Sequence, residues 1–205
     1  MPKVRIYIDG FNIYHAIDPI GDPKLKWLNY WTLSKGFLRD GEILDEVNFF
    51  TAVQNFDADK RKRHINYISA LRAVGVQVHE SNFKKAKKYC RSQTRYCDFH
   101  EEKQTDVAIA VKMVSDALRG EVSRAILLTA DSDQIPAVKF LNTLPTVKVT
   151  LIYPPGRASQ ARDLGNQVPD RRELTIGRLL TCLLPRTVYD QAGHAVAFMP
   201  AAYGS

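Results

Sequence analysis

The fold class follows from two stretches of the sequence, Val4–Asn12 (VRIYIDGFN) and Ala125–Asp133 (AILLTADSD). Each begins with a short apolar run rich in branched side chains, which predicts a buried β-strand. Aspartate follows each run within a residue or two. In open α/β sheets the functional crevice lies beyond the carboxyl ends of the strands. If the two strands are neighbours, their acidic residues therefore face one crevice.

Three further apolar runs, Val47–Val53, Val76–His79 and Val147–Tyr153, bring the number of predicted strands to five. Apolar residues at helical spacing predict helices between the strands, over Thr32–Arg39, Ala58–Val74, Asp106–Leu118 and Ile135–Leu144. This alternation predicts a mainly parallel sheet that helices cover on both faces. One more helix is predicted over Val168–Leu184. For the remaining residues, 186–205, a hairpin, a partner contact and a mobile tail all stay open.

The composition is that of one globular domain, because 45% of the 205 residues are hydrophobic and 25% are charged. Lysine and arginine number 29 against 22 aspartate and glutamate, and the formal net charge of +7 favours an anionic partner. No apolar run approaches the roughly 20 residues of a membrane span. Charged residues interrupt the first ten positions, unlike a signal peptide, and three cysteines do not make a secreted disulfide framework. We therefore expect a soluble, cytoplasmic protein.

The candidate metal ligands are four aspartates, Asp9, Asp106, Asp131 and Asp133. Aspartate near the start of a helix often caps it, which suffices to explain Asp106 or Asp133 taken alone. It does not explain Asp9, which ends an apolar strand just before Gly10 and Asn12. Several carboxylates in one crevice repel one another unless a cation neutralises them. Oxygen ligands without a histidine or cysteine cluster predict Mg²⁺ or Mn²⁺, which can activate water for phosphodiester hydrolysis.

A basic stretch independently favours a nucleic-acid substrate. Mobile cations suit phosphates and aromatic faces suit unpaired bases, so this mixture predicts single-stranded or looped RNA. A solvated basic loop is the alternative. The cations are Lys84, Lys85, Lys87, Lys88, Arg91 and Arg95, and Phe83, Tyr89 and Tyr96 interleave with them.

Two smaller features leave alternatives open. Arg157 either binds a substrate phosphate through paired hydrogen bonds of its guanidinium or is a surface arginine in a turn. Cys90 and Cys97 either hold a zinc ion or are two free thiols. Free thiols are the default, because the spacing of the two cysteines departs from Cys-x-x-Cys.

Four motifs in chain order, Tyr7–Asn12, Glu101–Val107, Thr129–Asp133 and Tyr153–Arg157, resemble NYN domain proteins, in the bacterial LabA-like branch of the PIN-like nuclease superfamily. The resemblance implies an α/β fold, a PIN-like three-layer sandwich with a mainly parallel five-stranded sheet in the order 3-2-1-4-5. It implies an NYN domain over residues 1–185 and a tail over residues 186–205.

The resemblance also implies roles for single residues. The family's metal-binding acidic positions map onto Asp9, Asp106, Asp131 and Asp133, with Asn12 as a polar partner. Ser132 either contacts a phosphate or caps the next helix. Asp116 either supports the site or is an ordinary surface carboxylate. PIN-like proteins frequently self-associate, so a homodimer is expected.

Three functions are compatible with these observations. The leading hypothesis is a Mg²⁺- or Mn²⁺-dependent ribonuclease in which the four aspartates hold the metal, Asn12 orients substrate or water, and the basic stretch holds RNA. The second is a non-catalytic RNA- or protein-binding regulatory module, because a fold and a metal site do not guarantee turnover. The third is a redox enzyme, since some relatives are described as hydroxylases of pyridine rings. It is the weakest, because no Gly-x-Gly-x-x-Gly follows any expected strand.

Overall fold

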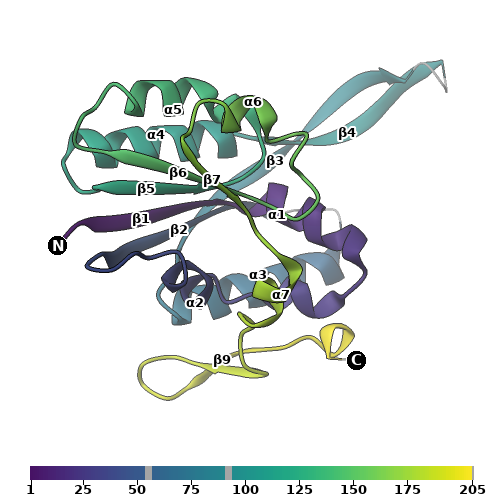
Figure 1. Ribbon diagram of the computed structural model, residues 1–205. Coiled ribbons are helices and arrows are strands. Elements are labelled where there is room, and N and C mark those ends of the chain that lie inside the picture. Colours follow the sequence, from purple (N-terminus) through teal and green to yellow (C-terminus); the bar gives the residue numbers. More distant parts are fainter. Residues whose placement is uncertain (54–56, 91–93, 205) are drawn as a thin grey trace.

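The computed structural model describes residues 1–53, 57–90 and 94–204, and among these the side chains other than those of 82–88, 90 and 97–103 (Figure 1). A seven-stranded sheet in the order β4-β3-β2-β1-β5-β6-β7 runs through this part of the chain. Neighbouring strands are parallel except β3 and β4. The strands are β1 (Lys3–Asp9), β2 (Ile43–Val53), β3 (Gln77–Cys90), β4 (Arg95–Lys103), β5 (Arg124–Leu128), β6 (Lys148–Tyr153) and β7 (Asp170–Glu173).

Helices cover both faces of the sheet, which gives three layers (Figure 1). One face carries α4 (Thr105–Leu118), α5 (Ile135–Leu141) and α6 (Arg162–Gly165). The other carries α1 (Gly10–Ile17), α2 (Tyr30–Lys35), α3 (Ala58–Ala73) and α7 (Ile176–Leu180). Short 3-10 turns are η1 (Asp18–Ile20), η2 (Pro23–Trp27), η3 (Ser132–Gln134) and η4 (Ala201–Tyr203).

The alternation of side chains along β1 divides the hydrophobic core in two. Ile6 and Ile8 pack with residues of α1, α2 and α3 on one face. Tyr7 packs with residues of α4 and α5 on the other. Because successive residues of a strand point to opposite faces, Asp9 follows Tyr7 to the α4 side, where the candidate site lies.

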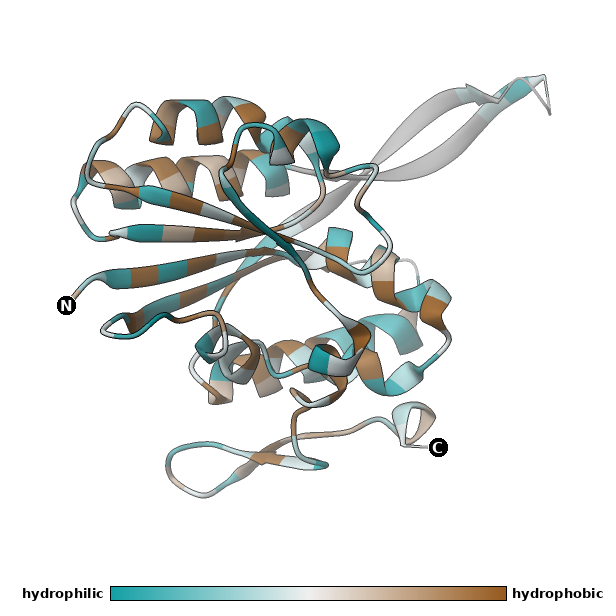
Figure 2. Ribbon diagram, in the orientation of Figure 1, coloured by the Kyte–Doolittle hydropathy of each residue, from teal (hydrophilic) through white to brown (hydrophobic). Residues whose placement is uncertain are grey.

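The predicted five-stranded sheet is wrong in strand count and therefore in order. The five expected runs became β3, β2, β1, β5 and β6 and are neighbours, but β4 and β7 extend the sheet at its two edges. The expected helix over Val168–Leu184 is also wrong. Its first part is β7, which pairs with β6 and appears as a hydrophilic ribbon in Figure 2. The backbone groups at the edge of β6 offer hydrogen bonds to β7, and these bonds outweigh the helical pattern of its sequence. Helix α7 begins only after Thr175, whose hydroxyl accepts a hydrogen bond from the backbone N of Arg178 at 3.2 Å.

The basic stretch is a strand rather than a loop. β3 pairs with β2 only over 77–82, and beyond Asn82 its backbone pairs antiparallel with β4 alone. This two-stranded ribbon reaches beyond the sheet (Figure 1). The side chains of Lys84, Lys85, Lys87, Lys88, Cys90 and Cys97 lie outside the described residues, and so does all of Arg91.

The segment after residue 185 packs onto α3. β8 (Thr187–Tyr189) and β9 (Ala195–Phe198) form an antiparallel hairpin. Val188 and Ala197 are buried in the hydrophobic core cluster that includes α3, and the Asn66 side chain exchanges two hydrogen bonds with the backbone of Phe198. The boundary between residues 185 and 186 stays a prediction. Among the described helices, none has both the length and the hydropathy of a membrane span.

Candidate metal centre

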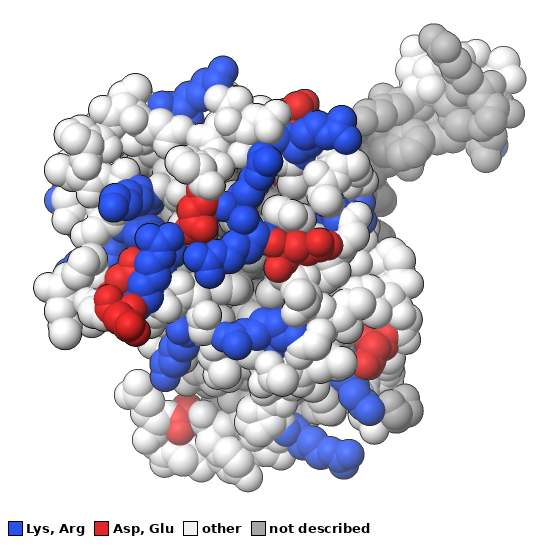
Figure 3. Space-filling view, in the orientation of Figure 1, with Lys and Arg blue, Asp and Glu red and all other residues white. Residues whose placement is uncertain are grey.

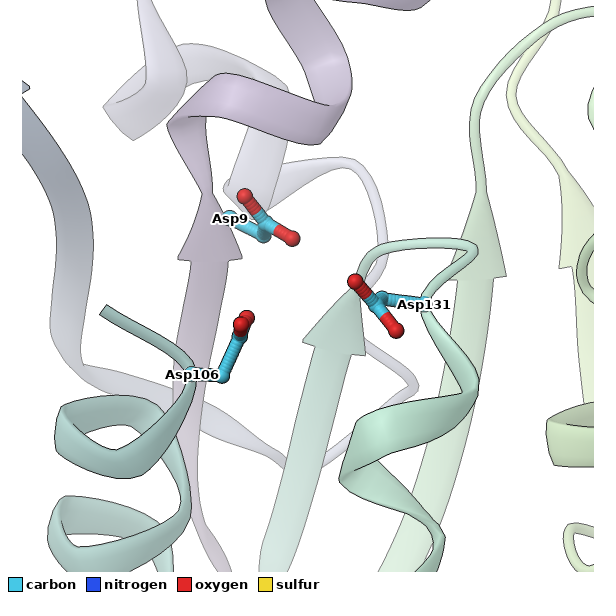
Figure 4. A group of neighbouring side chains, drawn as sticks. All are labelled: Asp9, Asp106 and Asp131. Atoms are coloured by element: carbon cyan, nitrogen blue, oxygen red, sulfur yellow. The ribbon is translucent and has the colours of Figure 1, made fainter. Parts of the chain in front are cut away.

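Three carboxylates meet at the carboxyl ends of β1 and β5 (Figure 4). Asp9 ends β1, Asp131 lies in the loop after β5, and Asp106 lies in the first turn of α4. One oxygen of each lies within 4.8 Å of the others. The two strands pair in parallel as far as Ile8 and Leu128, so both end at the same level. Parallel pairing therefore unites residues that are 122 positions apart (131 − 9) in the chain.

Asp9 accepts hydrogen bonds from the residues around it. Its Oδ1 accepts from the backbone N of Asn12 at 2.9 Å, which caps α1, and its Oδ2 accepts from Thr129 Oγ1 at 2.9 Å. Gly10 lets the backbone at the start of α1 lie close to β2, because a Cβ at this position would come within 2.4 Å of the Phe49 ring. The carboxylate is buried and oriented before any ligand arrives.

Asn12 and Thr129 connect the end of β1 and the start of α1 with the loop after β5. Asn12 Oδ1 accepts from the backbone N of Ala130 at 3.0 Å, and Thr129 Oγ1 accepts from the backbone N of Asp131 at 3.1 Å. Asn12 thus positions the loop after β5. The role of Thr129 was not predicted from the sequence. A usable signal was present, because this hydroxyl residue ends an apolar run two positions before Asp131.

Asp131, Ser132 and Asp133 differ in position. Asp131 caps η3, because its Oδ1 accepts from the backbone N of Asp133 at 2.9 Å, so the cap is not Ser132. Ser132 and Asp133 are exposed on η3. The structure does not bring Asp133 into the group of three carboxylates, and its role as a fourth ligand stays a prediction.

Burial and two neighbouring negative charges both act on the Asp106 carboxyl. Burial raises the pKa of its carboxyl, and the charges of Asp131 and Asp133 raise it further. Just before it, Gln104 has the left-handed φ of 85° and provides no side-chain cap for α4. A positive partner would therefore stabilise the charged form of the Asp106 carboxyl.

These residues fit a divalent metal ion. The three ligand groups are all carboxylates, which Mg²⁺ and Mn²⁺ prefer. Two buried polar atoms beside Asp106, Thr105 Oγ1 and Gln134 Oε1, have no hydrogen-bond partner among the described residues. Such atoms next to repelling carboxylates are consistent with a hydrated cation between them.

Replacing Asp106 by asparagine should stabilise the metal-free protein. Its folded pKa lies above the unfolded value, so protonation favours the folded state, and stability falls as the pH rises through that pKa. Asparagine mimics the protonated form, and because the site is partly solvated the gain at neutral pH should be about 0.5 kcal/mol. Thermal unfolding in EDTA measures it. A lower melting temperature for Asp106→Asn would contradict the repulsion between these carboxylates.

Arg157 is engaged within the protein. Its Nη2 donates to the backbone carbonyl oxygen of His15 at 2.7 Å, which joins the loop after β6 to α1. This contact favours the structural alternative for Arg157, while its role in phosphate binding stays a prediction.

Asp116 is neither a ligand nor a surface carboxylate. Its side chain is 1% exposed on the buried face of α4. It accepts from Tyr7 Oη at 2.8 Å and lies 3.1 Å from Arg5 Nη1 and 2.8 Å from Lys112 Nζ. The ten residues that separate it from Asp106 turn it toward β1 rather than toward the crevice.

Comparisons with known proteins settle the family. The model of the NYN domain family matches residues 3–171. The chain belongs to the NYN domain family. This NYN protein is 26% identical to the 6-hydroxy-3-succinoylpyridine 3-monooxygenase HspA of Pseudomonas putida, over 91% of this chain and 71% of that protein.

A solved structure shares the NYN protein's fold. It is that of a protein of unknown function from Vibrio parahaemolyticus, 19% identical, with a TM-score of 0.55 over 89% of this chain and 96% of the other. At this identity the likeness shows the fold alone. Assignment to the LabA-like branch stays a prediction.

Proposed function

We propose that this NYN protein is a metal-dependent hydrolase of RNA phosphodiester bonds. The observation that carries the proposal is the meeting of Asp9, Asp106 and Asp131 within 4.8 Å at the carboxyl edge of a nuclease-type fold.

The chain's own residues would hold and orient the metal. Mg²⁺ or Mn²⁺ bound there would supply an activated water and positive charge for the leaving oxygen. Asp9, fixed by Thr129 and the backbone N of Asn12, offers a rigid ligand. Asp131 and Asp106 reach solvent, so the open side of the site faces an incoming phosphate. Asn12 keeps the Asp131 loop against α1.

RNA as the substrate is supported by charge and by an aromatic pair. The net charge is +7, although basic and acidic side chains are mixed on the face over β7 (Figure 3). Tyr89 and Tyr96 are cross-strand neighbours near the end of the β3–β4 ribbon, and their rings meet edge to face with centroids 5.5 Å apart. They are 53% and 70% exposed, so unpaired bases can reach them.

Replacing both tyrosines by alanine is expected to weaken the binding of a single-stranded oligonucleotide. Stacking contributes roughly 1–3 kcal/mol per base, which corresponds, for one stacked base, to a loss of affinity of about 5- to 150-fold. Fluorescence anisotropy in EDTA measures binding without cleavage. The matched control is Tyr189→Ala, which removes a tyrosine that is 58% exposed on the β8–β9 hairpin. Equal affinities for the double variant and this control would refute the role of the ribbon.

The direct test of function is cleavage of a pool of labelled single-stranded and structured RNA. The wild type should cut with Mn²⁺ or Mg²⁺ and not with EDTA, and Asp131→Asn should not cut under any of these conditions. Metal-independent cutting, or cutting by the variant, would contradict the proposal. RNA binding without cleavage in both proteins would favour the regulatory module.

A second candidate function is oxidation of a pyridine derivative, which the similarity to HspA favours. A monooxygenase needs an electron donor as well as dioxygen. The two anionic groups of a dinucleotide pyrophosphate would be repelled by three carboxylates at the strand ends, where glycine-rich loops usually bind them. Consumption of NADH and dioxygen with a hydroxypyridine, retained in Asp131→Asn, would establish this function instead.

The homodimer and the cytoplasmic location stay predictions.

A further inference from the structure

Gln134 connects η3, which Asp131 caps, with the first turn of α4, which carries Asp106. It is the last residue of η3, and its side chain is completely buried. Its Nε2 donates to the backbone carbonyl oxygen of Asp106 at 3.1 Å. The same amide also interacts with the Asp106 carboxyl, where it lowers a pKa that burial and the neighbouring charges raise. One side chain thus links η3 to the first turn of α4.

The other half of this amide is unsatisfied. Gln134 Oε1 is buried and has no partner within the described part of the chain. The Thr105 hydroxyl, next to Asp106 on α4, is in the same state. A buried polar atom without a hydrogen bond destabilises the folded state. The link between the two elements needs only Nε2, so the fold alone gives no reason for an acceptor at the position of Oε1.

A hydrated cation would remove this cost. Mg²⁺ and Mn²⁺ usually keep several waters when carboxylates bind them, and such waters are hydrogen-bond donors. Groups in the outer shell of a metal orient its ligands and change its affinity. An acceptor such as Gln134 Oε1, buried in an amide that contacts Asp106, complements donors of this kind.

We propose that Gln134 is the positioning residue of the divalent cation site, with Nε2 fixing Asp106 and Oε1 accepting a hydrogen bond from the water shell of the ion. Thr105 Oγ1 offers the shell a second partner. The inference rests on the proposed metal site, and it adds two residues that hold the ion without being its ligands.

Gln134→Met provides the test, because methionine keeps the length of the side chain and removes both polar atoms. Affinity for Mn²⁺, measured by isothermal titration calorimetry, should fall about 10- to 100-fold, as for other outer-shell substitutions. The melting temperature in EDTA should change little, because removal of the unsatisfied Oε1 offsets the loss of the hydrogen bond from Nε2. Gln167→Met, which removes an amide from the loop before β7, is the matched control and should change neither quantity.

Thr105→Val is the second variant, since valine has the shape of threonine and leaves the Gln134 tie intact. It should weaken Mn²⁺ binding several-fold at an unchanged melting temperature. Mn²⁺ affinity within twofold of the wild type in both variants would overturn the inference, as would a fall in melting temperature without a loss of affinity. If the wild type itself binds no Mn²⁺, the proposed function fails together with the inference. If the wild type binds and the variants bind equally well, only the inference fails.

Discussion

Replacement of Asp9 by asparagine is expected to lower the rate of metal-dependent RNA cleavage by about 10³-fold or more, the scale seen when a member of a catalytic unit is removed. The change removes a charge from the buried end of the site. It keeps the shape of the side chain, and the amide oxygen can still accept from the backbone N of Asn12. The fold should therefore survive while the cation loses its most rigid ligand. Single-turnover cleavage of a labelled RNA measures the effect.

The matched control is Asp40→Asn. Asp40 is an exposed carboxyl in the turn before β2, at the opposite edge of the sheet from the strand ends that form the site. The control variant should cleave at the wild-type rate. A rate for Asp9→Asn that equals that of Asp40→Asn would remove Asp9 from the mechanism.

The largest expected effect on stability is that of Asp116→Ala. Removal of one partner from a buried ion pair leaves an uncompensated charge and typically costs 3–5 kcal/mol. Arg5 and Tyr7 would both lose their contact with Asp116. Because Arg5 also pairs with Asp45 and Glu121, at 2.7 Å each, we expect a decrease of about 3 kcal/mol in the free energy of unfolding.

Chemical denaturation of three variants tests the account of Asp116. Tyr7→Phe deletes a single hydroxyl and should cost about 1 kcal/mol. Asp163→Ala, an exposed carboxyl in α6, should stay within roughly 0.5 kcal/mol of the wild type. A loss of less than 1 kcal/mol for Asp116→Ala would show that Asp116 carries little of the stability attributed to its buried network.

The elements that sequence reasoning found are those with a buried face. Ile6 and Ile8 made β1 recognisable, and similar apolar patterns identified β5 and β6. Asp170–Glu173 has no such pattern, and it is a strand only because the edge of β6 pairs with it. The outer part of β3 likewise pairs with β4 alone, beyond the sheet. Strands without a core face leave no periodic signal.

The site could be predicted in part for a related reason. Asp9 and Asp131 could be identified from the sequence because parallel strands end at one edge of the sheet. The exposed position of Asp133 depends on the short turn of η3, whose direction no spacing encodes. The burial of Asp116 depends on which face of α4 meets β1. The roles of Thr129 and Gln134 appear only in the structure, as hydrogen bonds to Asp9 and Asp106, which are distant in the sequence.

The central claim is that three carboxylates form a divalent cation site, and calorimetric titration of Mn²⁺ tests it most directly. The wild type and Asp40→Asn should bind Mn²⁺ with the same affinity and stoichiometry, and Asp131→Asn should show at least about a tenfold loss of affinity. Equal binding by all three proteins, or no binding by the wild type, would contradict the account.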